Sequence, residues 1–203
     1  MRSQQAQILP ILEWPHPILQ TPSSPVNHFD QQLAEDIEVM WNTMYDAEGI
    51  GLAAPQVGDR RRIFVMDCTP RQKTARALVC INPELLHLQG QVNSAEGCLS
   101  FPGLAVEVPR SEVLTLKAQD LKGQWFEMQL EGMEAICAQH EMDHLNGKSF
   151  LDLLGPLERV ACFQSYVEKL EKSTAPHLSK TIQLAQEVLS GFIQQALNGE
   201  VDE

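Results

Sequence analysis

Residues 139–147, Gln-His-Glu-Met-Asp-His-Leu-Asn-Gly, constrain this chain more than any other stretch. His140 and His144 are four residues apart, and on an α-helix this spacing places both imidazoles on one face, where they can share a metal ion. Glu141 follows the first histidine and can reach a water molecule that the metal activates. Gly147 stands where the end of a helix favours a left-handed backbone. The stretch therefore predicts a helix that carries two ligands of a metal site.

The residues before this stretch predict that the helix is buried. Met133, Ile136 and Cys137 continue the face of the two histidines at helical spacing. A ligand-bearing face that is otherwise apolar is typical of a helix inside a core. A helix with two incidental histidines is the alternative, and this short pattern alone leaves both interpretations open.

A catalytic metal site needs a third protein ligand and one open position. Cys98, in the stretch Glu-Gly-Cys-Leu-Ser at 96–100, is the best candidate. Cys137, one turn before His140, competes for this role, although three ligands from one helix could surround a metal only awkwardly. A buried structural thiol is the alternative interpretation of Cys98.

Residues 49–58, Gly-Ile-Gly-Leu-Ala-Ala-Pro-Gln-Val-Gly, form a third notable stretch. Its glycines and alanines carry little side-chain bulk, so the backbone of a ligand could approach closely. Its only side-chain amide is that of Gln56. A simple turn between a helix and a strand is the alternative.

The three stretches, in this order, resemble the GxGxAAxQ, EGCxS and QHExDHLxG motifs of the peptide deformylases. The resemblance covers about residues 8–172 and implies a hydrolase that removes the formyl group from formyl-methionine at the start of newly made polypeptides, releasing formate. It implies one divalent metal, with Fe²⁺ expected and Zn²⁺, Ni²⁺ or Co²⁺ able to substitute. The implied metal ligands are Cys98, His140 and His144. The implied catalytic groups are Glu141 as the base, with the Gln56 side chain and the Leu99 backbone N–H as donors to the oxyanion.

The resemblance also implies a pocket for the substrate. Small residues around Gly51 leave no room for a methyl group and would favour formyl over acetyl. Arg110 lines up with a family arginine near the peptide-binding groove. We read Asp143 as a residue that orients a ligand or a neighbouring chain, with a surface carboxylate as the alternative. The residues expected to contact the substrate are Gly49, Ile50, Gly51, Gly97, Arg110, Met133, Ile136 and Cys137.

Periodicity elsewhere in the chain predicts an α+β fold. An apolar stripe from Leu33 to Met44 predicts a helix that Asp30 can cap. Buried strands are expected at 62–67 and 78–82, and further strands at 104–108, 112–118 and 124–130, with a hairpin turn at 122–123. Further helices are expected from Pro156 and over an apolar stripe at 178–193. The resemblance implies the same architecture, with mostly antiparallel sheets around the metal-binding helix. We expect a catalytic domain at 1–172 and a C-terminal helical extension at 173–203.

Composition excludes several classes of function. The 203 residues are 43% hydrophobic, which suits one globular domain. The net charge of −12 disfavours binding to nucleic acids or anionic membranes. No apolar run approaches the ~20 residues of a membrane span, and the first residues lack the apolar core of a signal peptide. Five scattered cysteines fit reduced thiols, so a cytoplasmic protein is expected.

The chain departs from the family pattern in two places. His16 and Gln20 stand where family members carry an acidic residue and an arginine, and the residues after 172 exceed the usual bacterial length. Some family members dock on the ribosome through a basic C-terminal helix, but residues 157–172 carry as many acidic as basic side chains, so this docking is doubtful. A secondary deformylase-like paralogue with altered substrate preference or low activity is therefore the alternative.

Two further classes remain as rivals. A zinc metallopeptidase would need a third ligand downstream of His144, such as His177 or a carboxylate beyond it. A binding protein with a closed structural metal would have no use for the base Glu141 or the amide of Gln56.

Overall fold

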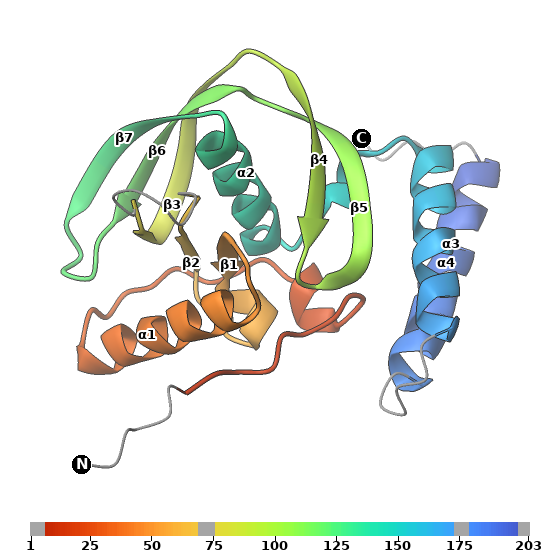
Figure 1. Ribbon diagram of the computed structural model, residues 1–203, viewed down its shortest axis with the longest axis horizontal. Coiled ribbons are helices and arrows are strands. Elements are labelled where there is room, and N and C mark those ends of the chain that lie inside the picture. The colour runs from red at the N-terminus through yellow and green to blue at the C-terminus, as the bar shows by residue number, and fades with distance from the viewer. Residues whose placement is uncertain (1–6, 69–75, 173–178, 199–203) are drawn as a thin grey trace.

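Two antiparallel sheets surround one central helix in the computed structural model, which describes residues 7–68, 76–172 and 179–198 (Figure 1). The larger sheet contains, in spatial order, β1 (Gly51–Ala53), β2 (Ile63–Met66), β3 (Leu78–Gln89), β6 (Val113–Gln119) and β7 (Trp125–Glu131). The smaller sheet pairs β4 (Val92–Cys98) with β5 (Phe101–Arg110). The prediction of an α+β fold with mostly antiparallel sheets around a central helix is confirmed.

The larger sheet follows the predicted apolar runs. All four residues of β2 are buried, and Phe64 of this strand pairs with Cys80 of β3. The hairpin from β6 to β7 turns at Gly123, whose φ of 74° is a left-handed conformation that suits glycine. The strand predictions at 62–67, 78–82, 112–118 and 124–130 are confirmed, although β3 extends further than expected.

Two strands near the candidate site, β4 and β1, were not predicted. Strand β5 has alternate buried residues, as its sequence pattern indicates, but its partner β4 has mostly exposed or half-buried residues. Its polar sequence therefore carries no apolar periodicity that could reveal it. The short strand β1 lies within the stretch that could also have been a simple turn.

Helix α1 (Gln31–Asp46) forms as its sequence predicts. The Asp30 side chain accepts a hydrogen bond of 2.9 Å from the backbone N–H of Leu33 and so caps the helix. Leu33, Ile37 and Met40 are at most 2% exposed and pack against the larger sheet. Both the cap and the apolar stripe are confirmed.

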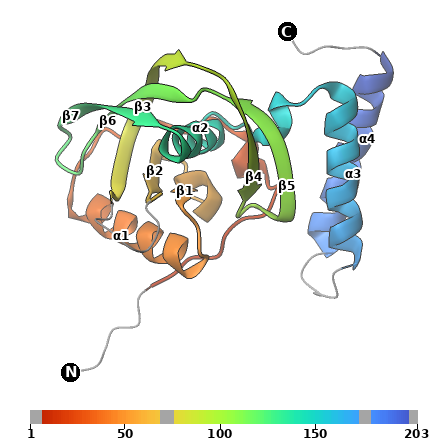
Figure 2. The same ribbon diagram turned by 45° about the horizontal axis from the view of Figure 1, so that its top comes forward.

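Helix α2 (Met133–Leu145) lies between the two sheets and carries the histidine pair (Figures 1 and 2). Gly147, two residues after its last residue, has a φ of 70°. A Cβ at this position would lie 2.9 Å from backbone atoms of Gln20 and Thr21, so the close approach of the N-terminal segment also requires glycine. The predicted left-handed glycine is confirmed.

Within the described residues, three 3-10 helices connect these elements: η1 (Pro17–Gln20), η2 (Ala54–Val57) and η3 (Phe150–Leu153). The second one matters for the site because Gln56 lies in it. No helix in the described part of the chain has the length and apolar character needed to cross a bilayer.

Helices α3 (Pro156–Lys172) and α4 (Ser179–Asn198) lie side by side at one edge of the molecule, next to β5 (Figures 1 and 2). Ala185 is fully buried, and Ile182 and Leu189 pack against the same apolar cluster. Ile193, predicted to share this face, is 40% exposed, and the neighbouring Phe192 packs instead against Trp14 and Phe163. Leu178 lies outside the described residues.

Candidate metal centre

Cys98, His140 and His144 meet between the end of β4 and one face of α2. One ligand atom from each lies within 4.8 Å of the other two, and no other group of three potential ligands in the described chain is as close together. Cys98 Sγ is 3.2 Å from His144 Nε2. One thiol and two imidazoles are a donor set that suits a divalent transition metal, so the residues fit the implied metal. Cys137 is not part of this group.

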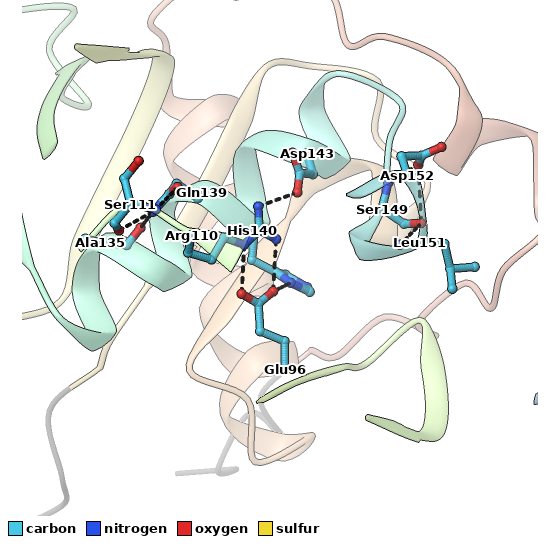
Figure 3. A network of polar contacts seen from close by, with 10 residues as sticks. All are labelled: Glu96, Arg110, Ser111, Ala135, Gln139, His140, Asp143, Ser149, Leu151 and Asp152. Carbon is cyan, nitrogen blue, oxygen red and sulfur yellow. Dashed lines mark hydrogen bonds and ion pairs between the residues drawn. The ribbon is translucent and has the colours of Figure 1, made fainter. Parts of the chain in front are cut away.

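His140 is held from behind by a buried network of charged groups (Figure 3). Its Nδ1 lies 2.9 Å from Glu96 Oε2, which leaves Nε2 as the nitrogen that can reach a metal. Arg110 donates two hydrogen bonds to the Glu96 carboxylate, at 2.8 and 2.9 Å, and a third to Asp143 at 2.8 Å. Asp143 is thereby tied to the ligand His140 through two intervening side chains.

Arg110, which was expected to contact the substrate, lies behind His140 and not in the wall of the cavity. The residue is 5% exposed, and it is not among the residues that line the pocket described below. Its guanidinium group binds the carboxylates of Glu96 and Asp143 behind His140, because a buried cation needs anionic partners. Burial opposes the charge on Glu96, but hydrogen bonds from His140 and Arg110 outweigh it and lower the pKa of Glu96.

Glu141 lies beside the ligands and is only 3% exposed. Burial raises the pKa of its carboxyl group to about 7, which suits a group that exchanges protons near neutral pH. Its Oε2 is buried and has no hydrogen-bond partner within the described chain. A Cβ at Gly51 would lie 2.3 Å from Glu141 Oε1 and 2.7 Å from Cys137 Sγ. Only glycine at position 51 therefore allows strand β1 to approach the Glu141 carboxylate this closely.

Gln56 is fixed at both ends of its carboxamide. Its Oε1 accepts a hydrogen bond of 2.8 Å from the Ala53 N–H, and its Nε2 donates to Ser100 Oγ at 3.2 Å. Nε2 also lies 3.7 Å from Cys98 Sγ, so the donor end faces the candidate metal centre. Leu99 follows Cys98 in the turn between β4 and β5 and lines the pocket.

A cavity of about 470 Å³ opens over His140, Glu141 and Cys98. It brings together every residue predicted to contact the substrate except Arg110. These residues are Gly49, Ile50, Gly51, Gly97, Met133, Ile136 and Cys137. A Cβ at Gly49 would lie 2.9 Å from Leu99 Cδ1, so the cavity wall is tightly packed there as well.

Three residues of the site were not predicted from the sequence: Glu48, Glu96 and Ser100. Glu48 lines the cavity with a φ of 55°, which is unusual for a residue other than glycine. In the sequence, only its position directly before the 49–58 stretch indicates that it could lie near the site. Glu96 and Ser100 lie inside the Glu-Gly-Cys-Leu-Ser stretch, but their partners became visible only in the folded chain. His177, considered as a downstream ligand, lies outside the described residues.

Comparison with known proteins identifies this arrangement. A family model described as "Polypeptide deformylase" matches residues 8–160. A peptide deformylase of Acidobacterium capsulatum is 42% identical over 152 residues, which are 75% of this chain and 89% of that protein. One from Alkalilimnicola ehrlichii is 45% identical over 152 residues, covering 75% and 85% of the two chains. The crystal structure of a peptide deformylase from Legionella pneumophila matches with a TM-score of 0.76 at 42% identity, covering 83% of this chain and 99% of that one.

Proposed function

The chain belongs to the peptide deformylase family, and we propose that Cys98, His140 and His144 hold the metal with which it removes the formyl group from the N-termini of new polypeptides. One observation carries the assignment of these residues. Two of the three clustered ligands, Cys98 and His140, border one cavity that opens to solvent, together with the buried Glu141 and the amide of Gln56. A closed structural metal site would need neither the base nor the cavity.

A divalent metal bound by these ligands would act as a Lewis acid towards the formyl carbonyl and the attacking water. Glu141 accepts the proton of that water and returns it to the leaving amine. Its raised pKa, which burial sets to about 7, suits both transfers. The Gln56 Nε2 and the backbone N–H of Leu99 donate to the oxygen that becomes negative, and one such donor typically contributes ~10²–10³ in rate.

The chain's own contacts prepare these groups before substrate binds. The Ala53 N–H holds Gln56 Oε1, so the amide cannot turn its acceptor end towards the developing charge. Glu96 holds His140 in one orientation and one tautomer. Such preorganised groups need no rearrangement during the reaction.

The cavity suits formyl-methionine. Glu141 and Cys137 leave no room for a Cβ at Gly51, and this tight wall supports selection of a formyl hydrogen over an acetyl methyl group. Ile50 and Met133 are 45% and 54% exposed at the cavity and can cover a methionine side chain with apolar surface. Ile136 and Cys137 complete this wall in our assignment.

We propose Fe²⁺ as the resident metal, with Zn²⁺, Ni²⁺ or Co²⁺ able to replace it. The thiolate of Cys98 and the two imidazoles suit all four ions, so cellular supply decides which one is bound. Purification without oxygen, followed by elemental analysis, tests this assignment. Iron bound in about one equivalent per chain is the expected result.

Nascent polypeptides that begin with formyl-methionine are the proposed partners, which implies work in the cytoplasm. The charges of α3 do not favour docking on the ribosome. Lys169 donates to the backbone oxygen of Gly103, and Arg159 donates to that of Leu151 and lies over the Phe192 ring. Two of the three cations of this helix are therefore already engaged with the chain itself. We also propose that residues 1–172 form the catalytic domain and 173–203 an extension.

Release of formate tests the function. The metal-loaded protein is incubated with a short formyl-methionine peptide, with its acetylated analogue and with the unmodified peptide. We expect formate from the first peptide only, with all three peptide chains left uncut. Cleavage of internal peptide bonds would instead indicate a metallopeptidase, and the absence of any turnover would indicate a binding protein.

A further inference from the structure

Two free cysteines from distant parts of the sequence meet at the wall of the cavity. Cys137 lies on α2 and lines the cavity, and Cys68 comes shortly after β2. Cys137 belongs to a buried apolar cluster against which Cys68 packs, so the two side chains are neighbours. Neither residue has a role in the mechanism above other than the contribution of Cys137 to the methionine wall.

The surrounding backbone holds the two cysteines together from both sides. Cys68 Sγ lies 3.9 Å from the carbonyl oxygen of Met133, one helical turn before Cys137. The carbonyl oxygen of Ile50 accepts a hydrogen bond of 2.8 Å from the N–H of Asp67 and lies 3.7 Å from Cys137 Sγ. The residue before Cys68 and the side chain of Cys137 therefore share one carbonyl group. Cys68 therefore lies just after β2 against the first turn of α2, the helix that carries Cys137.

The two thiols differ in their access to solvent. Cys137 is only 4% exposed, whereas Cys68 is half-buried at the edge of the same apolar cluster. The hydrogen bond with Cys68 and burial raise the pKa of Cys137 well above its ordinary value, so Cys137 remains a neutral thiol. A soluble oxidant therefore meets Cys68 first.

We propose that Cys68 and Cys137 form a redox site, in which a hydroperoxide converts the two thiols into a disulfide that deforms the methionine wall. With hydrogen peroxide, the Cys68 sulfur attacks the O–O bond, and the products are a sulfenic acid and one water molecule. The Cys137 sulfur then displaces the hydroxyl group of this sulfenic acid. The S–O bond breaks, the S–S bond forms, and the hydroxide leaves with the thiol proton as a second water molecule. The peroxide gains two electrons, one from each sulfur, and a dithiol can reverse the change.

The crosslink affects the cavity because Cys137 has little space in which to move. Its sulfur lies so near Gly51 that a Cβ there would be only 2.7 Å away, and the S–S bond to Cys68 moves this sulfur and the wall beside it. We expect the KM for a formyl-methionine peptide to rise about tenfold, the scale of a misfit of one methylene group in a pocket. The effect on KM rests on the proposed function, whereas formation of the crosslink does not.

Peptide mapping of the oxidised protein tests the proposal directly. The full chain, loaded with Zn²⁺ so that the metal itself is not oxidised, is treated with hydrogen peroxide. It is then alkylated under denaturing conditions and digested without reduction. We expect a linked pair of peptides that contain Cys68 and Cys137, together with a tenfold higher KM, and dithiothreitol should reverse both.

Two variants provide matched controls. Cys68→Ala should keep the activity of the untreated protein and lose both the linked peptides and the reversible rise in KM. Cys162→Ala removes a half-buried free cysteine on α3 and should keep both responses. Irreversible oxidation of Cys98 would affect all three proteins alike and is not reversed by dithiothreitol.

Several outcomes would overturn the proposal. These are alkylation of both Cys68 and Cys137 after peroxide treatment, linkage of Cys137 to Cys80 instead, or a reversible rise in KM that persists in Cys68→Ala. A crosslink that leaves KM unchanged would refute the effect on the pocket. If untreated protein releases no formate, the proposed function fails, while the peptide map still decides whether the redox pair exists.

Discussion

His140 Nδ1 lies 2.9 Å from Glu96 Oε2, so the first histidine of the helix is held by a residue two positions before the cysteine of the same centre. The Glu96 carboxylate also accepts two hydrogen bonds from Arg110, which donates a third to Asp143. The motif that supplies Cys98 thus orients the motif that supplies the histidines. This relationship links metal affinity to residues that cannot bind the metal themselves.

Glu96→Gln should weaken metal binding while the protein stays folded. The amide holds His140 less strongly than a carboxylate, and partners of this kind typically change metal affinity 10–100-fold. Competition of Zn²⁺-loaded protein with a chelator measures the affinity. Glu107→Gln is the matched control, because this side chain is exposed on the neighbouring strand β5. Equal affinities of both variants and the wild type would show that Glu96 does not support the ligand.

Arg110→Met should lower the free energy of unfolding far more than loss of an exposed arginine does. The substitution leaves the buried Glu96 and the half-buried Asp143 without their cation, and loss of one partner from a buried pair typically costs about 3–5 kcal/mol. Arg76→Met is the control, because Arg76 pairs with Glu134 at the surface and is 44% exposed. Loss of such a pair costs about 0–1 kcal/mol. In urea denaturation, Arg110→Met should therefore unfold at a clearly lower midpoint concentration than Arg76→Met. Equal midpoints would contradict the buried network.

Gly51→Ala should abolish most activity. The added Cβ would lie 2.3 Å from Glu141 Oε1, so either the carboxylate or β1 must move. Gly191→Ala is the control, since a Cβ at this position of α4 would meet nothing within 4 Å beyond the adjacent backbone of its own helix. Alanine is favoured over glycine in a helix by about 1 kcal/mol, so this variant should be slightly more stable and fully active. Formate release and thermal unfolding are the measurements, and an active Gly51→Ala protein would contradict the observed approach.

Removal of residues 174–203 should separate stability from catalysis. Helix α4 covers Trp14 and Phe163 through Phe192, and the truncation would expose this apolar surface. We expect a lower melting temperature or association in sizing chromatography, with formate release per bound metal largely retained. A soluble, metal-loaded truncation with over ~100-fold lower turnover, about 2.7 kcal/mol, would show that the extension shapes the active site.

The sequence predicted those parts of the fold and site that depend on local spacing. The four-residue interval from His140 to His144 and the apolar stripe of α1 are helical patterns, and the structure has helices at both places. The left-handed Gly147 follows from the same local logic.

The failures concern pairings between distant segments. Arg110 is 14 residues from Glu96 and 33 from Asp143, so its place behind the ligand helix depends on the tertiary fold rather than on its neighbours. Strand β4 is polar on its exposed side and becomes a strand because β5 pairs with it. The contact between Cys68 and Cys137 likewise has no signature in the sequence.

The central claim is that Glu141 moves the proton in a reaction at a metal held by Cys98, His140 and His144. Formate release per bound metal, compared between the wild type and Glu141→Gln, tests it most directly. The amide has nearly the same size but cannot accept a proton, so metal content should persist while turnover falls by about 10²–10⁴-fold, the usual contribution of such a base. A metal-loaded Glu141→Gln protein that releases formate at a near wild-type rate would contradict the account.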